Sequence, residues 1–421
     1  MAANRILLAG AVLALAVLAA SCGGGGGGGG GGGSGGSSST SSSSGASGGG
    51  SANNLMTVTV ERGPGNNINI PYVSVTICAP GSTTNCQTID HILLDTGSTG
   101  LRVVASLLSA NVVLPQQADG SGNAIAECVA FVDGYVWGSV RQADVTLGGL
   151  TASAIPIQLI GDPALSAVPT GCSSRGAQAE NTPTTLFANG VLGVSTWLQD
   201  CGDYCAQLPT PDGHYYICPS ATTCTPTTVA TADQIPNPVA KLVAENNGVI
   251  IEFPAVAAAG ASSATGTMTL GIDTQSNNAL GTLVAFDLDP YNGAAGANYG
   301  GQSLEAYFDT GSNGIFFPDG TIAVCSSTSN AAGFFCPTST LNLNAIVQGY
   351  GSVASSTVDF SVANADQLVS AGARAFSNLA APADATFQVF DWGMPFFYGR
   401  RVAFAIEQTR AGTRTGPFIA F

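Results

Sequence analysis

Two copies of the tetrapeptide Asp-Thr-Gly-Ser, beginning at Asp95 and Asp309, are the residues of this chain best suited to chemistry. An apolar strand-like run enters each copy and another leaves it. One Asp-Thr-Gly is expected by chance in roughly one chain in ten of this length, but two strand-flanked copies, each followed by Ser-x-Gly, are far more specific. A pair of simple β-turns is the alternative, yet it leaves unexplained why carboxylates stand in buried-looking strands, where unpaired charge is costly.

Paired carboxyl groups explain why these residue types are needed. Two carboxylates held face to face cannot both ionise, so they share a proton. One can then accept a proton from a bound water while the other protonates a carbonyl oxygen, and neither a metal nor an organic cofactor is required. The residues that follow each Asp are expected to support the pair through glycine N–H groups, serine hydroxyls and threonines that bond across to the opposite loop: Thr96, Gly97, Ser98, Thr310, Gly311 and Ser312.

The elements around the motifs are predicted to be short strands. Alternating or apolar runs bounded by Gly, Pro or Asn indicate strands at 57–60, 72–77, 89–94, 143–147, 155–159, 249–253 and 267–270. The clearest helix is predicted over Pro238–Glu245, before Gly248. This pattern predicts an all-β fold, and the motif recurring after 214 residues (309 − 95) predicts one lobe design used twice.

The N-terminal residues predict export. Arg5 precedes an apolar run, Ile6 to Ala20, that is too short to span a membrane and typical of a signal peptide, residues 1–21. Ala19-Ala20-Ser21-Cys22 is similar to the lipobox of bacterial lipoproteins, although Leu18 stands four rather than three positions before the cysteine. We therefore expect acylation of Cys22; ordinary cleavage that discards Cys22 is the alternative.

Residues 22–53 form a Gly/Ser-rich segment that predicts a flexible tether with a reach of roughly 30 Å. Gly23 stands where inner-membrane retention signals usually place Asp, which favours an outer-membrane lipoprotein in the bacterial cell envelope, facing the periplasm or the surface. Membrane contact is expected through the lipid anchor only.

Composition limits the remaining possibilities. The net charge of −15 with only 11 basic residues excludes nucleic acid as an expected partner. The 368 residues after the tether (421 − 53) suffice for two lobes with cores, which we place at 54–275 and 276–421.

Ten cysteines beyond Cys22 in an exported chain predict five disulfides. Spacing favours Cys78–Cys86 and Cys325–Cys336, and elimination favours Cys128–Cys172. Three pairings stay open for Cys201, Cys205, Cys218 and Cys224, which lie in an insertion of the first lobe. A zinc site using the nearby His214 is the weaker alternative for this cluster.

The run Asp95 to Val103 resembles the first catalytic loop of the pepsin-like aspartic peptidases, and Asp309 to Ser312 resembles the second. Asn189–Val194 and Phe390–Gly393 are similar to the segments that thread beside those loops, and Gly266–Asp273 to the strand that joins the lobes. The resemblance, from about residue 69 to residue 421, implies a bilobal double barrel with an active-site cleft between the lobes. It implies a monomer that cleaves extended peptides or proteins. The closing run, residues 390–399, also resembles a bacterial lipoprotein family of unknown function.

The chain departs from the peptidase pattern at three points, one of which is Phe131, the residue nearest the expected position of the flap Tyr. Arg102 replaces the Trp that supports the Tyr of the mobile flap, and Asp391 replaces an apolar residue in the second threading segment. Phe131, Tyr135 and Trp137 are the candidates for the flap aromatic; simple packing is the alternative for all three.

These departures leave two functions open. The leading prediction is an aspartic endopeptidase, because two buried, coupled carboxylates are costly unless they are used. The alternative is a catalytically inactive envelope lipoprotein that keeps the fold for binding or structure, favoured by the altered flap and the cysteine-rich insertion.

Overall fold

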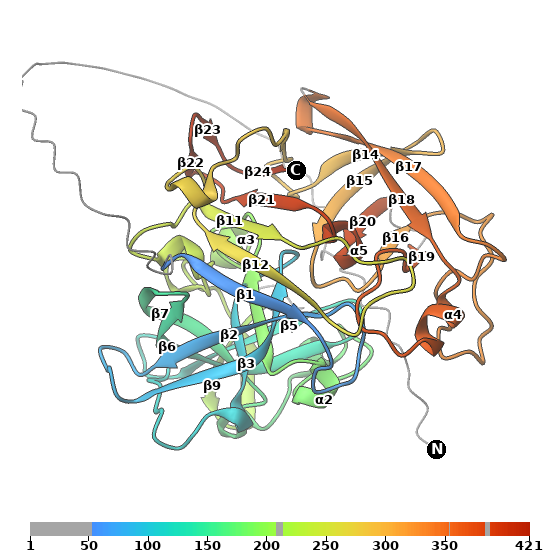
Figure 1. The fold of residues 1–421 in the computed structure, drawn as a ribbon. Helices are drawn as coiled ribbons and strands as arrows, with labels where there is room; N and C mark the ends of the chain where they lie inside the picture. Colours follow the sequence, from blue (N-terminus) through green and yellow to red (C-terminus); the bar gives the residue numbers. More distant parts are fainter. Residues whose placement is uncertain (1–52, 208–213, 353, 384–387) are drawn as a thin grey trace, which may run out of the picture.

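The computed structural model describes residues 53–207, 214–352, 354–383 and 388–421 (Figure 1). The predicted signal peptide, Cys22 and the tether up to residue 52 lie outside the described residues. Within the described part of the chain, no helix is both long and apolar enough to cross a membrane.

Strands dominate, so the predicted all-β class is confirmed. The first part of the chain forms β1 (Leu55–Val60), β2 (Pro71–Cys78), β3 (Cys86–Asp95), β4 (Thr99–Val104), β5 (Ala124–Ala130), β6 (Tyr135–Leu147), β7 (Leu150–Ile160), β8 (Gly190–Val194), β9 (Tyr215–Ser220), β10 (Thr223–Pro226), β11 (Gly248–Glu252) and β12 (Ala264–Leu270). The rest forms β13 (Ala285–Asp287), β14 (Ala295–Tyr299), β15 (Gln302–Asp309), β16 (Ile315–Phe317), β17 (Leu341–Gln348), β18 (Ser355–Val362), β19 (Ala380–Pro382), β20 (Val389–Gly393), β21 (Arg401–Ala405), β22 (Arg410–Ala411), β23 (Arg414–Thr415) and β24 (Phe418–Ala420).

The α-helices are single turns or little more: α1 (Thr170–Ser173), α2 (Pro183–Leu186), α3 (Gly202–Gln207), α4 (Ala365–Ser370) and α5 (Met394–Phe397). The helix predicted over Pro238–Glu245 is wrong. Only a 3₁₀ turn, η4 (Val239–Lys241), forms there, and the chain then turns extended at Leu242, which bridges to Ala152 of β7. Eight residues with helical propensity cannot outweigh such tertiary pairing, because helices this short have little stability of their own.

Two large sheets divide the strands. Fifteen strands follow the order β10-β9-β5-β6-β7-β4-β8-β3-β2-β1-β12-β11-β21-β24-β13, and seven follow β18-β17-β14-β15-β20-β16-β19. Figure 1 shows the orange strands β14 to β18 on one side and the blue and green strands on the other, with β11, β12 and β21 between them. The late strands β21 and β24 thus belong to the same sheet as the first half of the chain.

The surroundings of the two motifs are built alike. β3 runs parallel to β8, which pairs antiparallel with β4; β15 runs parallel to β20, which pairs antiparallel with β16. In register, Asp95 lies opposite Gly193, and Asp309 lies opposite Gly393. The predicted double use of one design is therefore present in the strand pairing, and both predicted threading segments lie beside their motifs.

All ten cysteines of the described chain are paired. The predicted Cys78–Cys86, Cys128–Cys172 and Cys325–Cys336 bonds are confirmed. The open choice in the insertion is decided as Cys201–Cys205 and Cys218–Cys224, so these four sulfurs are used in disulfides.

Candidate active site

The two Asp-Thr-Gly-Ser loops meet at the junction of the sheets and are bonded to one another. The Thr96 hydroxyl donates to the Phe308 carbonyl at 2.8 Å and accepts from the Thr310 N–H at 2.9 Å. The Thr310 hydroxyl donates to the Leu94 carbonyl at 2.6 Å and accepts from the Thr96 N–H at 3.1 Å. This reciprocal set of four hydrogen bonds places the ends of β3 and β15 against each other and satisfies buried polar groups on both sides.

Each carboxyl group receives the same two donors from its own loop. Asp95 accepts from the Gly97 N–H at 2.8 Å and from the Ser98 hydroxyl. Asp309 accepts from the Gly311 N–H at 2.8 Å and from the Ser312 hydroxyl, also at 2.8 Å. The residues are 6% and 3% exposed, so the protein rather than solvent orients both carboxyl groups.

The motif glycines lie against the opposite carboxyl group. A Cβ on Gly97 would stand 2.7 Å from Cγ of Asp309, and one on Gly311 would stand 2.7 Å from Oδ1 of Asp95. Any larger residue would therefore push the two acids apart, which explains why glycine is needed at both positions.

This environment favours one retained proton. Burial and the negative charges of Asp95 and Asp391 raise the pKa of Asp309 well above its usual range, and the hydrogen bond from Ser312 opposes the rise only in part. Two adjacent acids, one of which holds its proton tightly, are the arrangement that paired acid and base chemistry needs.

A family described as "Protein of unknown function (DUF3443)" matches residues 50–421. The chain belongs to this family. Among solved structures, the aspartic proteinase from Irpex lacteus is similar at 16% identity, with a TM-score of 0.47, over 87% of this chain and 96% of that one. No curated protein sequence matches the chain.

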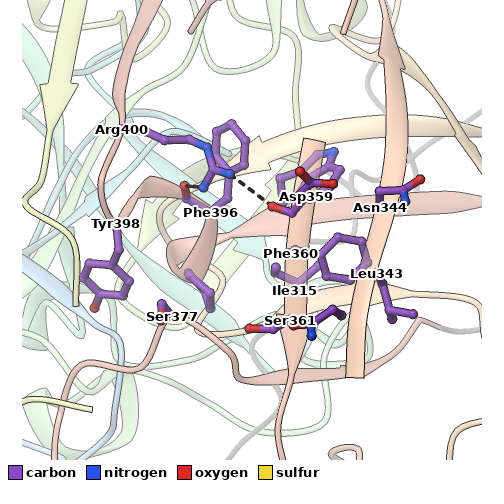
Figure 2. A pocket seen from close by; sticks show the side chains of 13 residues that line it. Ile315, Leu343, Asn344, Asp359, Phe360, Ser361, Ser377, Phe396, Tyr398 and Arg400 are labelled. Carbon is purple, nitrogen blue, oxygen red and sulfur yellow. Dashed lines mark hydrogen bonds between the residues drawn. The ribbon is translucent and has the colours of Figure 1, made fainter. Parts of the chain in front are cut away.

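In this family member, two hollows differ in size and in what lines them. A hollow of about 50 Å³ adjoins Asp309, the Thr96-Gly97 loop and Trp197. A larger one, about 570 Å³, is lined by residues of β17, β18 and α5 and by the residues that follow α5. Figure 2 shows Arg400 bonded to the Phe396 and Asp359 carbonyls at its border. Neither Asp95 nor Asp309 lines the larger hollow.

The three flap candidates lie in packing clusters. Tyr135 and Trp137 pack with the Cys128–Cys172 disulfide, and the Trp137 indole N–H donates to the Leu165 carbonyl at 3.0 Å. Phe131 packs against Val129 and Val136 in a neighbouring cluster. Their assignment to a flap stays a prediction.

The β5–β6 hairpin that carries these aromatics is held on several sides. β9 pairs with β5, a disulfide joins Cys128 to Cys172, and Tyr135 exchanges backbone hydrogen bonds with the 178–180 segment. A hairpin fixed in this way has less freedom to open and close than an isolated one.

Arg102, which stands where a Trp was expected, lies at the centre of a buried cluster of charged residues. Its guanidinium lies 2.6 Å from Glu127 and 3.4 Å from Asp200. The His214 ring lies 3.2 Å from Asp200 and 3.4 Å from Glu127, and the Tyr215 hydroxyl donates to Asp200 at 2.8 Å. Two basic and two acidic groups thus neutralise one another beneath the hairpin.

The sequence gives no local signal for this cluster, because its members are up to 112 residues apart (214 − 102). Glu127, Asp200 and His214 could also hold a metal ion by the positions of their ligand atoms. The guanidinium already supplies positive charge to Glu127, which makes a second cation there unfavourable.

His214 should make stability depend on pH. Burial alone would lower its pKa, but hydrogen bonds and charges from Asp200 and Glu127 outweigh burial and raise the pKa to about 9. A folded pKa above the unfolded value of about 6.5 gives stability that is present below that value and lost as pH rises through 9. We expect the fall in melting temperature between pH 7 and 9 to be shallower in His214→Gln. His91→Gln is the control, since His91 is partly exposed and outside the cluster. An equal fall in melting temperature between pH 7 and 9 in the His91→Gln and His214→Gln variants would contradict this prediction.

Proposed function

We propose that this chain is an aspartic endopeptidase in which Asp95 and Asp309 act as one acid–base pair. The observation that carries the proposal is the matched donor set on two buried carboxyl groups, fixed by the reciprocal threonine bonds between their loops. A pair positioned by so many bonds on both sides is preorganised for proton transfer rather than for a surface contact.

The proposed reaction assigns different roles to the two acids. Asp309 holds the shared proton, because burial and its acidic neighbours raise its pKa. As a water oxygen attacks the peptide carbonyl carbon, Asp95 takes the water proton and Asp309 protonates the carbonyl oxygen. Collapse of the diol returns a proton to Asp309, breaks the C–N bond and passes the Asp95 proton to the leaving amine. The two acids return to their starting state, in which Asp309 is protonated and Asp95 is ionised, and a new water can then bind.

We further propose a substrate class and a cellular location for the protein. The substrate would be an extended peptide or protein, reached from a Gly/Ser tether on an acylated Cys22 in the bacterial envelope. A monomer suffices, since both acids come from one chain.

The pH dependence of cleavage tests the proposal. The full-length chain should cleave an unbiased peptide mixture in acid, and kcat/KM should fall as pH rises through the raised pKa of Asp309, because both acids are then ionised. A statine-type inhibitor, whose hydroxyl imitates the diol, should block cleavage. Cleavage that persists unchanged into alkaline pH, or that ignores the inhibitor, would refute the shared-proton mechanism.

A binding function without catalysis is the second candidate. Two observations favour it: the hairpin expected to close over substrate is fixed by a disulfide and by β9, and a hollow large enough for a small ligand lies in the seven-stranded half (Figure 2). Binding of peptides without cleavage at any pH would favour this candidate over the peptidase.

A further inference from the structure

Asp391 is an acid of the site that the proposed reaction leaves unused. It lies on β20, two residues before the Gly393 that faces Asp309 in register, and it is 3% exposed. Neither of its carboxyl oxygens has a hydrogen-bond partner of standard geometry among the described residues. A buried carboxyl left in this state costs free energy, so its presence calls for an explanation.

The groups that face Asp391 are mostly apolar or acidic. On the strands beside it, the register partners are Tyr307, whose hydroxyl bonds to Glu305, and the uncharged Phe316. α5, which follows β20 directly, has the sequence Met-Pro-Phe-Phe and no titratable group. The charge that acts on Asp391 is that of Asp95, a member of the pair. The charge of Asp391 acts in turn on Asp309.

These surroundings make Asp391 a weak acid. Burial raises the pKa of Asp391 to about 8; the Ser312 hydroxyl opposes the rise and the charge of Asp95 adds to it. Ser312 also donates to Asp309 at 2.8 Å, so the same hydroxyl influences both acids. When Asp391 ionises, its charge makes loss of the Asp309 proton harder.

We propose that Asp391 is a third acid beside the pair, a positioning residue next to Ser312 whose negative charge, once it ionises, keeps the shared proton on Asp309 and extends activity toward mildly alkaline pH. This inference rests on the proposed peptidase function and adds to it a built-in control of working pH. Asp391 touches no reacting atom, and acts through Ser312 and through its charge.

The amide variant Asp391→Asn keeps the shape and removes the charge. In the full-length chain, acting on a peptide that the wild type cleaves, we expect the alkaline limb of the kcat/KM profile to move to lower pH by roughly one unit or more, the effect of one nearby buried charge. Activity at acid pH should stay within a few-fold of wild type. Asp359→Asn removes an exposed acid of the same half of the chain and should leave the limb in place. An alkaline limb that does not move in Asp391→Asn would overturn the proposal.

A direct titration separates this inference from the peptidase proposal. ¹³C NMR of aspartate-labelled wild-type chain should show a carboxyl resonance, missing in Asp391→Asn, that titrates far above the usual aspartate range. Titration of that resonance in the usual range would overturn the role of Asp391 whether or not the chain cleaves peptides. If the amide variant does not fold, the wild-type spectrum is the test. A carboxyl resonance that titrates above the usual range, in addition to the resonances of Asp95 and Asp309, supports the proposal. The absence of such an additional resonance overturns it. Absence of cleavage by wild type at every pH would instead refute the peptidase proposal.

Discussion

Asp309→Asn is expected to lower kcat by about 10³-fold or more, since a positioned acid or base contributes about 10²–10⁴ and here one residue serves in both halves of the reaction. The amide keeps the size of the side chain, and its one oxygen can still accept from the Gly311 N–H. Its NH2 group replaces the oxygen that accepts from Ser312 and can donate to that hydroxyl instead. The amide cannot deliver the proton to the carbonyl oxygen. Peptide cleavage followed by mass spectrometry at the acid optimum measures the loss.

Two companion variants make this result specific. Asp95→Asn should lose a similar amount, and the double variant should be little worse than either, because residues that act as a unit are strongly non-additive. Asp359→Asn, an exposed acid on β18, should retain wild-type turnover. If Asp309→Asn stays within tenfold of wild type, the pair is not the catalytic machinery.

Arg102→Met is expected to destabilise the folded chain by about 3–5 kcal/mol, the cost of removing one partner from a buried ion pair. Arg102 is 1% exposed and Glu127 is fully buried at 2.6 Å from it. The substitution would leave Glu127 and Asp200 with only His214 to balance two negative charges in an apolar surrounding. Urea unfolding monitored by tryptophan fluorescence measures the change, and Trp137, buried on β6 in the packing cluster of the Cys128–Cys172 disulfide, is one of the reporters.

Arg401→Met is the matched control. Its guanidinium lies 3.4 Å from Glu252, and the two side chains are 25% and 57% exposed. Exposed pairs contribute about 0–1 kcal/mol, so this variant should unfold close to wild type. Equal unfolding midpoints for the two methionine variants would show that the Arg102 cluster contributes no more than a surface pair.

Most parts of the fold that the sequence predicted correctly are encoded in consecutive residues; Cys128–Cys172 is an exception, predicted by elimination. The two motifs, their flanking strands and the short cysteine pairs each depend on neighbours in the chain. The pairing in the insertion could not be chosen, because spacing allows three connectivities among Cys201, Cys205, Cys218 and Cys224 and only the fold selects one.

The features that the sequence did not predict depend on contacts between distant residues. Arg102 was noted as a replaced Trp, but its partners Glu127, Asp200 and His214 come from three separate segments. The helix predicted over Pro238–Glu245 was wrong because of another contact between distant residues. Pairing of Leu242 with Ala152 overrides the local helix propensity. Asp391 was visible as an acid in a segment expected beside the second loop, but its electrostatic effect on the Asp309 carboxyl group was not predicted.

The placement of β21 and β24 has a consequence for how the molecule is made. These strands, at residues 401–405 and 418–420, pair with β11 and β13 in a sheet that also contains β1, which begins at residue 55. Contacts over such separations form slowly, because the closure of long loops precedes any gain from pairing. The edge of β11 therefore stays open until almost the whole described chain has emerged, and until then it would need protection from pairing with other chains.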